Sequence, residues 1–238
     1  MATVTNPPPD FGRKLIASPF HTVGLLLIQF GLAAVGAYLQ NRPSGGPNLA
    51  AEHTGIVPLY VSILALEWGL VWYVWGGIRD KGHGLLDLVG GRWSSWKNVG
   101  VDLAIALPFW AVWEATARLV HFVLGEGSAK AIQVLLPQSW LEIVLWVALS
   151  ASAGVCEEIV FRGYFQKQFQ ALTGSIALAV VLQAIIFGAG HAYQGMKQVV
   201  VISVLGGLYG VLAAWRKNLR PGMIAHTWSD VFGGLLEK

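Results

Sequence analysis

Charged residues are scarce in this sequence. Only 12% of its 238 residues are Asp, Glu, Lys or Arg, whereas soluble domains carry about 25%. Hydrophobic residues make up 55% of the chain, and its mean hydropathy is +0.56. A core of this size cannot bury that much apolar surface, so the surplus must face lipid. The composition therefore excludes an ordinary soluble enzyme and a disordered chain.

Cysteine pairs, internal repeats and a basic stripe are also missing. The single cysteine, Cys156, excludes an intramolecular disulfide and hence a disulfide-stapled scaffold. No segment recurs at a period of roughly 20 to 50 residues, which excludes a repeat architecture. The net charge is +3, but the basic residues are scattered through short connections between apolar blocks. Nucleic acid is therefore not an expected partner.

The chain contains seven apolar blocks. They predict an all-α, polytopic transmembrane helix bundle of about seven spans, within a range of six to eight. The blocks occupy residues 19–39, 57–78, 101–124, 140–161, 176–191, 199–215 and 223–236. The first four approach the ~20 residues that cross a bilayer, and the first is too long for a cleaved signal peptide. We expect residues 1–18 to form a cytoplasmic tail and residues 19–238 a single transmembrane domain.

The distribution of lysine and arginine predicts the orientation of the bundle, because cytoplasmic connections carry the excess. Eleven basic residues, Arg162 among them, are assigned to one side and four to the other, while Arg118 lies inside a block. We therefore expect an integral membrane protein with a cytoplasmic N-terminus, in the plasma membrane if the source is a bacterium.

Ionisable residues inside apolar helices are costly, so each is a candidate functional residue. The second half of the chain holds three such clusters: Glu157 and Glu158 with Arg162, then His191, then His226 with Asp230. Glu158 and Arg162 have the i, i+4 spacing of a pair on one helix face, as do His226 and Asp230. If the fourth helix ends at Thr173-Gly174, Glu157 and His191 differ in height by only about 3 Å.

These clusters resemble the three motifs of the CAAX-protease and bacteriocin-processing family of intramembrane endopeptidases, also called the Abi family. The resemblance covers about residues 140–236, the expected catalytic core. It implies that Glu157 activates water with help from His191, while His226 and Asp230 hold the oxyanion or a metal. Many members have asparagine where this chain has Asp230. An ionised aspartate cannot donate a hydrogen bond to an oxyanion, but it can orient His226.

Two schemes for activating water remain open. The zinc-protease spacing His-Glu-x-x-His is absent, so no metal site is firmly indicated and we favour a metal-free glutamate mechanism. A divalent metal such as zinc, held by His191, His226 and Asp230, is the alternative. The pair Glu158 and Arg162 is expected to support the site as a structural ion pair.

The preferred function is hydrolysis of a peptide bond in a membrane-associated peptide or protein, so the expected partners are that substrate and the lipid bilayer. Glu114, Arg118 and His121 form a rival stripe on one face of the third apolar block. They favour a structural pair, or a proton route in a proton-coupled transporter. A non-catalytic membrane adaptor is the third alternative. The sequence identifies neither the substrate nor the oligomeric state.

Overall fold

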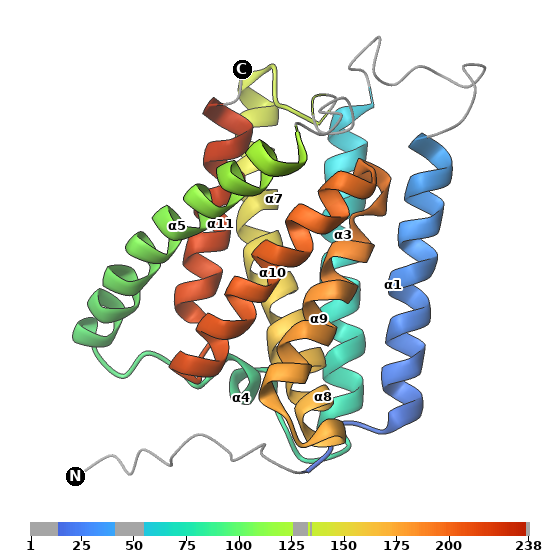
Figure 1. The fold of residues 1–238 in the computed structure, drawn as a ribbon, viewed down its shortest axis with the longest axis vertical. Coiled ribbons are helices and arrows are strands. Elements are labelled where there is room, and N and C mark those ends of the chain that lie inside the picture. The colour runs from blue at the N-terminus through green and yellow to red at the C-terminus, as the bar shows by residue number, and fades with distance from the viewer. Residues whose placement is uncertain (1–13, 41–54, 126–132, 134, 237–238) are drawn as a thin grey trace.

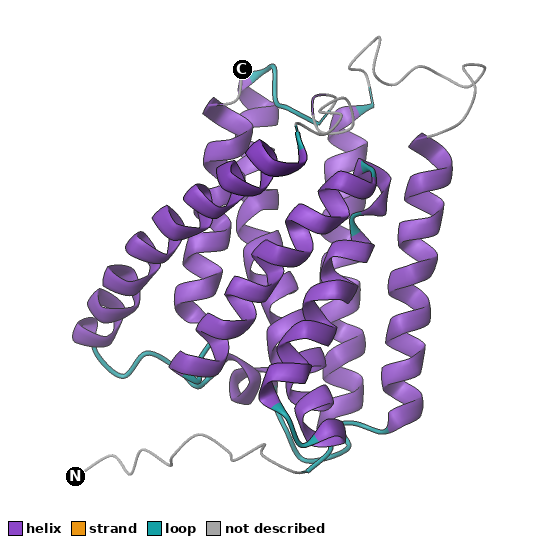
Figure 2. Ribbon diagram, viewed as in Figure 1, coloured by secondary structure: helices purple, strands orange, loops and turns teal. Residues whose placement is uncertain are grey.

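The computed structural model describes residues 14–40, 55–125, 133 and 135–236, and within these ranges the chain is helical without strands (Figure 2). Most of the predicted cytoplasmic tail, residues 1–13, lies outside the described residues. The principal helices are α1 (Pro19–Gln40), α3 (Ile56–Arg79), α5 (Trp96–Leu124), α7 (Trp140–Glu157), α9 (Ile176–Gly190), α10 (Met196–Arg216) and α11 (Arg220–Leu236). Each coincides with one predicted apolar block. The predicted all-α bundle is therefore confirmed.

Five of the described helical segments are long and apolar enough to cross a bilayer. They are α1, α3, α5, the continuous segment from α7 to residue 173, and α10. By contrast, α9 has 15 residues and α11 has 17, so both are shorter than the other blocks. These five spans fit an integral membrane protein, while α9 and α11 are too short to be counted among the spans.

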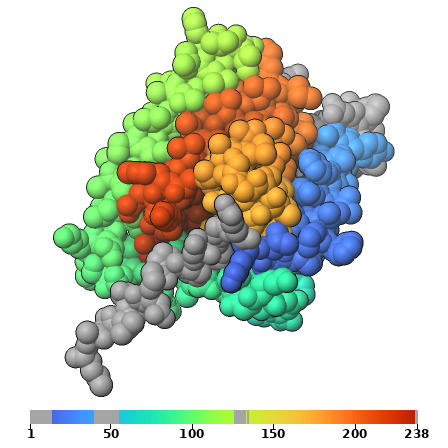
Figure 3. Space-filling model, turned by 60° about the horizontal axis from the view of Figure 1, so that its bottom comes forward, coloured from blue at the N-terminus to red at the C-terminus, as the bar shows by residue number. Residues whose placement is uncertain are grey.

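The helix at the centre of the bundle is α7, which packs against α3 and α11 (Figure 1). Along the chain the principal helices alternate in direction, and α5 lies obliquely on the flank opposite α1. Seen from the end that holds α4 (Leu85–Val89), α5 and α1 again form opposite flanks, with α10, α11, α8 and α9 between them (Figure 3). This arrangement surrounds the C-terminal half of α7 with protein.

Beyond α7 the helix continues without a break as η1 (Glu158–Phe165), a π-helix, and then α8 (Gln166–Thr173). The backbone N–H of Gln166 donates to the carbonyl of Phe161, the i→i+5 bond of a π-helix. Gly174 ends the helix in the left-handed region with φ 71°, as the sequence predicts. At the other end, Glu142 and Ser139 form a capping box. Glu142 is thus a helix-capping residue.

A buried carboxylate, which the sequence did not reveal, connects the ends of three elements. Asp102 of α5 accepts a hydrogen bond from the Trp93 indole (2.8 Å) and ion pairs from Arg216 Nη2 (3.1 Å) and Arg220 Nε (2.9 Å). Its side chain is 1% exposed. Because these arginines end α10 and begin α11, Asp102 fixes the oblique α5 against the α10–α11 turn.

Asp102→Asn should lower the free energy of unfolding by about 2 to 3 kcal/mol, because the amide removes the charge that neutralises two arginines. Thermal unfolding in detergent micelles would measure the effect. Asp80→Asn is the matched control, since Asp80 is 77% exposed and lies 3.7 Å from Arg79 in an open pair. Equal melting temperatures for the two variants would contradict a structural role for Asp102.

Candidate active site

A buried carboxylate lies at the start of the π-helix. Glu158 Oε1 is 3.0 Å from Arg162 Nη1 and 3.2 Å from His226 Nδ1. The first contact is the i, i+4 pair that the sequence predicts, and the second joins η1 to α11. Both side chains of the Glu158–Arg162 pair are closed to solvent, with 1% and 0% exposure. The pair therefore belongs to the interior of the bundle.

From the sequence, Arg162 was assigned to the basic connections on one side of the membrane. This assignment is wrong, because Arg162 is buried in the bundle. Its guanidinium donates from Nη2 to the carbonyl of Gly206 on α10 (3.1 Å). It also lies over the rings of Phe187 and Tyr209, 4.3 and 5.1 Å from their centroids. An arginine inside a membrane bundle needs such partners because leaving it unpaired is costly.

Gly206 makes room for this arrangement. A Cβ at position 206 would come within 2.7 Å of Phe187 Cδ1 and 3.2 Å of Arg162 Nη2. Any larger residue would displace the guanidinium or the ring. Neither Gly206 nor Tyr209 was a candidate from the sequence, although the glycines at 206, 207 and 210 have the spacing that permits close helix packing.

His226 lies where α7 and α11 converge. Its Nδ1–H donates toward Glu158, which leaves Nε2 facing Glu157 Oε2 at 3.5 Å and Asp230 Oδ2 at 3.8 Å. The imidazole is stacked on the Tyr209 ring, with centroids 5.0 Å apart and an interplanar angle of 25°. Carboxylates from two helices thus meet at one imidazole nitrogen.

Exposure divides the four acidic and basic side chains around His226 into two pairs. Glu157 and Asp230 have side chains that are 24% and 35% exposed, whereas Glu158 and Arg162 are closed. The Nε2 side of His226 is therefore bordered by partly exposed carboxylates, whereas its Nδ1 side is closed. The geometry separates a partly open side of the ring from the side that holds it.

His191 follows α9 directly, as its C-terminal cap. Its Nδ1–H donates to the carbonyl of Phe187 (2.8 Å), so the neutral ring carries its lone pair on Nε2. The ring of Phe187 contacts both imidazoles, with centroids 4.9 Å from His191 and 6.1 Å from His226. Among the described residues no hydrogen bond or ion pair joins His191 to Glu157, His226 or Asp230. The two histidines are neighbours separated by Phe187.

The same arrangement bears on the proposed zinc ligands. In the part of the chain that the structure describes, no three His, Cys, Asp or Glu side chains are grouped closely enough to hold a metal ion. The nitrogen of His226 that faces Glu158 is engaged by that carboxylate. His191, His226 and Asp230 therefore do not form a preassembled ligand set, and we derive no catalytic step through a metal.

The rival stripe on α5 has a different character. No ion pair within 4 Å joins Glu114, Arg118 or His121 to another described residue, so the expected structural pair is not formed. Arg118 is exposed on the outer flank of the bundle. Another intramembrane acid, Glu67 of α3, is buried and accepts a hydrogen bond from Ser152 of α7 (2.5 Å). This hydrogen bond connects α3 to α7.

Arg162→Met should destabilise the folded protein by about 3 to 5 kcal/mol, because it leaves the Glu158 carboxylate buried without its cation. The double variant Glu158→Gln/Arg162→Met removes both charges and should recover part of that loss. Thermal unfolding in one detergent compares the variants, with Arg118→Met on the exposed flank of α5 as the control. A double variant no more stable than Arg162→Met alone would show that the ion pair does not account for the loss.

Comparison with known families supports the resemblance noted in the sequence. Residues 138–232 match the family model described as "Type II CAAX prenyl endopeptidase Rce1-like". No match was obtained with curated proteins, and none with solved structures. The matched segment runs from the turn before α7 into α11, and so it contains Glu157, His191, His226 and Asp230. Residues 138–232 thus carry an Rce1-like segment, which confirms the resemblance to the CAAX-protease and bacteriocin-processing family.

Proposed function

We propose that this protein is an intramembrane endopeptidase in which Glu157 activates the attacking water. The observation that carries the proposal is the convergence of Glu157 and Asp230, from two different helices, on Nε2 of one buried histidine. The family match supports membrane protease activity. The partial exposure of Glu157 supports its contact with water, whereas Glu158 is closed and serves to hold His226.

In the proposed reaction, Glu157 removes a proton from water as the water oxygen attacks the carbonyl carbon of the scissile peptide bond. The carbonyl oxygen becomes an oxyanion, toward which His226 donates from Nε2. Glu157 then transfers its proton to the departing amide nitrogen, and the C–N bond breaks. The products are a carboxylic acid and an amine, which become a carboxylate and an ammonium at neutral pH, and Glu157 returns to its ionised form.

This scheme requires His226 to carry protons on both ring nitrogens. Glu158 accepts the Nδ1 proton, so donation from Nε2 needs the second one. The carboxyl groups of Glu157, Glu158 and Asp230 surround the His226 ring. They attract a positively charged imidazolium. Asp230 thereby supports the donor form of His226 and need not donate a hydrogen bond itself. The aspartate at this position is compatible with oxyanion stabilisation.

His191 is assigned a supporting role in handling protons. The Phe187 carbonyl fixes its tautomer, so Nε2 can accept a hydrogen bond from the water or from the leaving amine. Its ring is held on Phe187, beside His226, rather than in direct contact with the carboxylates. His191 therefore assists Glu157 once substrate and water bridge the two sides of Phe187.

The substrate class remains that of a membrane-associated peptide or protein. The description of the matching family names prenyl endopeptidases, so short peptides with a prenylated cysteine near the C-terminus are the first substrates to assay. Unprenylated peptides of the same sequence form the comparison.

Glu157→Gln should abolish cleavage, with a loss of at least a hundredfold in turnover, while the melting temperature stays near that of the wild type. The amide has nearly the same shape but cannot accept the proton of water. Quenched-fluorescent peptide cleavage by purified protein in detergent or nanodiscs measures turnover.

Glu114→Gln is the matched control for this substitution and also tests the transporter alternative. The proposed protease retains cleavage after Glu114→Gln, because among the described residues no ion pair joins Glu114 to Glu157, His226 or Asp230. Substrate cleavage retained by Glu157→Gln would remove Glu157 from the mechanism. A wild-type protein without turnover on any peptide, combined with proton-coupled uptake that Glu114→Gln abolishes, would instead support the transporter.

Asp230→Asn distinguishes the metal-free scheme from the zinc alternative. In the metal-free scheme the amide stays close to His226 and can donate to the oxyanion, so we expect turnover within about tenfold of the wild type. Each protein is assayed before chelation, after exhaustive chelation, and after zinc is restored. Wild-type activity that disappears on chelation and returns with zinc, together with an inactive Asp230→Asn protein, would establish metal-assisted catalysis instead.

A further inference from the structure

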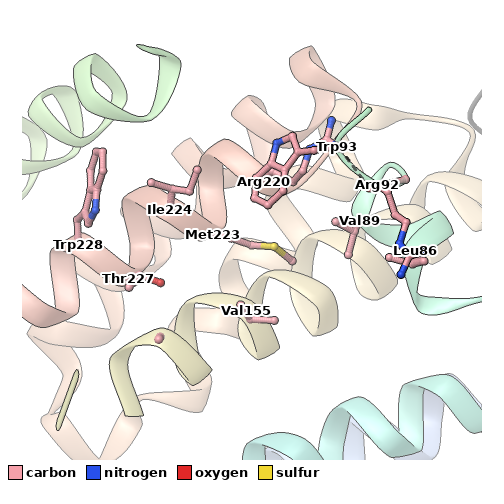
Figure 4. Close-up of a pocket in the computed structure, with 12 residues that line it drawn as sticks. Leu86, Val89, Arg92, Trp93, Val155, Arg220, Met223, Ile224, Thr227 and Trp228 are labelled. Atoms are coloured by element: carbon pink, nitrogen blue, oxygen red, sulfur yellow. Dashed lines mark hydrogen bonds between the residues drawn. The ribbon is translucent and has the colours of Figure 1, made fainter. Parts of the chain in front are cut away.

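A groove of about 640 Å³ lies between α4, α7 and α11 (Figure 4). Its walls are mainly apolar and include Val89 of α4, Val155 of α7 and Ile224 of α11. Its size falls in the range of about 300 to 1,000 Å³ that is usual for sites of small ligands. Lining residues extend along α11 from Arg220 to Trp228, which is about 12 Å of helix. The groove is thus an open, mainly apolar channel long enough for part of an acyl chain.

One end of the groove carries positive charge. Arg92 and Arg220 line it there, next to Trp93 (Figure 4). Arg220 is engaged by Asp102 and by the carbonyl of Gly91. Arg92 is exposed, and no carboxylate of a described residue lies within ion-pair distance of it. Its guanidinium is therefore available to an anion.

The charges around this end do not cancel. Arg92, Arg216 and Arg220 contribute three positive charges, and the buried Asp102 contributes one negative charge. The local balance is therefore two positive charges beside an apolar channel. A molecule that is anionic at one end and apolar along the rest matches both features. In a membrane protein the abundant molecule of this kind is an anionic phospholipid.

The groove lies on a different side of α7 from the proposed catalytic base. Glu157 follows Val155 by two residues and so projects about 200° further round the helix. The two helices also meet tightly: a Cβ added to Gly154 would come within 2.9 Å of the Met223 carbonyl. This contact of α7 with α11 separates the groove from Glu157, His226 and Asp230.

We propose that the groove between α4, α7 and α11 binds one anionic phospholipid, with its phosphate at Arg92 and an acyl chain along Val155, Met223 and Ile224. The exposed Trp93 lies at the charged end, where indole rings are usual at the level of lipid headgroups. The bound lipid fills the space between α4 and the α7–α11 pair. This inference does not rest on the proposed protease activity.

Native mass spectrometry of the purified full chain can test the lipid site, with equimolar phosphatidylglycerol and phosphatidylcholine added as probes. Wild-type protein should retain phosphatidylglycerol about fivefold more than phosphatidylcholine, since a basic residue near a lipid surface contributes about that factor. Arg92→Gln should reduce the ratio to near one. Lys97→Gln, which removes a basic residue at the start of α5 outside the groove lining, should leave the ratio unchanged.

Two further measurements distinguish a bound phospholipid from other ligands of the groove. Ile224→Trp should reduce the retention of both lipids by filling the apolar channel. Glycerol phosphate, which has the anion without the chain, should not displace phosphatidylglycerol at equal concentration. Equal lipid ratios for wild type and Arg92→Gln would overturn the proposal. So would displacement by glycerol phosphate, which indicates a plain anion site, or by a cleavable peptide, which indicates a substrate surface.

Discussion

A charge enclosed in a membrane bundle must be neutralised by protein, and the Glu158 carboxylate imposes this constraint on the structure. It draws Arg162 from the same helix and His226 from α11 into contact. Arg162 in turn needs the Gly206 carbonyl and two aromatic faces, so α9 and α10 must also come close. Four elements are therefore held in register around one ion pair, and the proposed catalytic groups depend on that register.

The π-helix explains how neighbouring glutamates acquire different surroundings. Glu157 is the last residue of α7 and remains partly exposed, while Glu158 begins η1 and is closed. All eight residues of η1 are buried. An i→i+5 segment stays helical only where packing compensates for its poorer geometry, and such segments are frequent at functional sites. Here the change of helix type coincides with the boundary between the proposed catalytic base and its structural support.

The sequence allowed the seven helices to be placed, because apolar runs bounded by basic turns depend only on local composition. The spacing of Glu158 and Arg162 predicted their pairing, since four residues return to one helix face. It could not show that Arg162 is buried, because a charge at the end of an apolar block resembles a loop residue. Asp102 likewise shows no pattern of its own, and both of its arginine partners, Arg216 and Arg220, lie more than 100 residues away along the chain.

The sequence alone determined that this chain forms a helical membrane bundle with acidic and histidine groups in its second half. Those features follow from hydrophobicity and from the high cost of placing ionisable groups in lipid. Only the tertiary structure decided that His226 receives carboxylates on both ring nitrogens, that Phe187 separates it from His191, and that Tyr209 stacks on it. Such contacts depend on how helices rotate and cross. That geometry arises from packing among residues far apart in the chain, where sequence spacing gives no direction or distance.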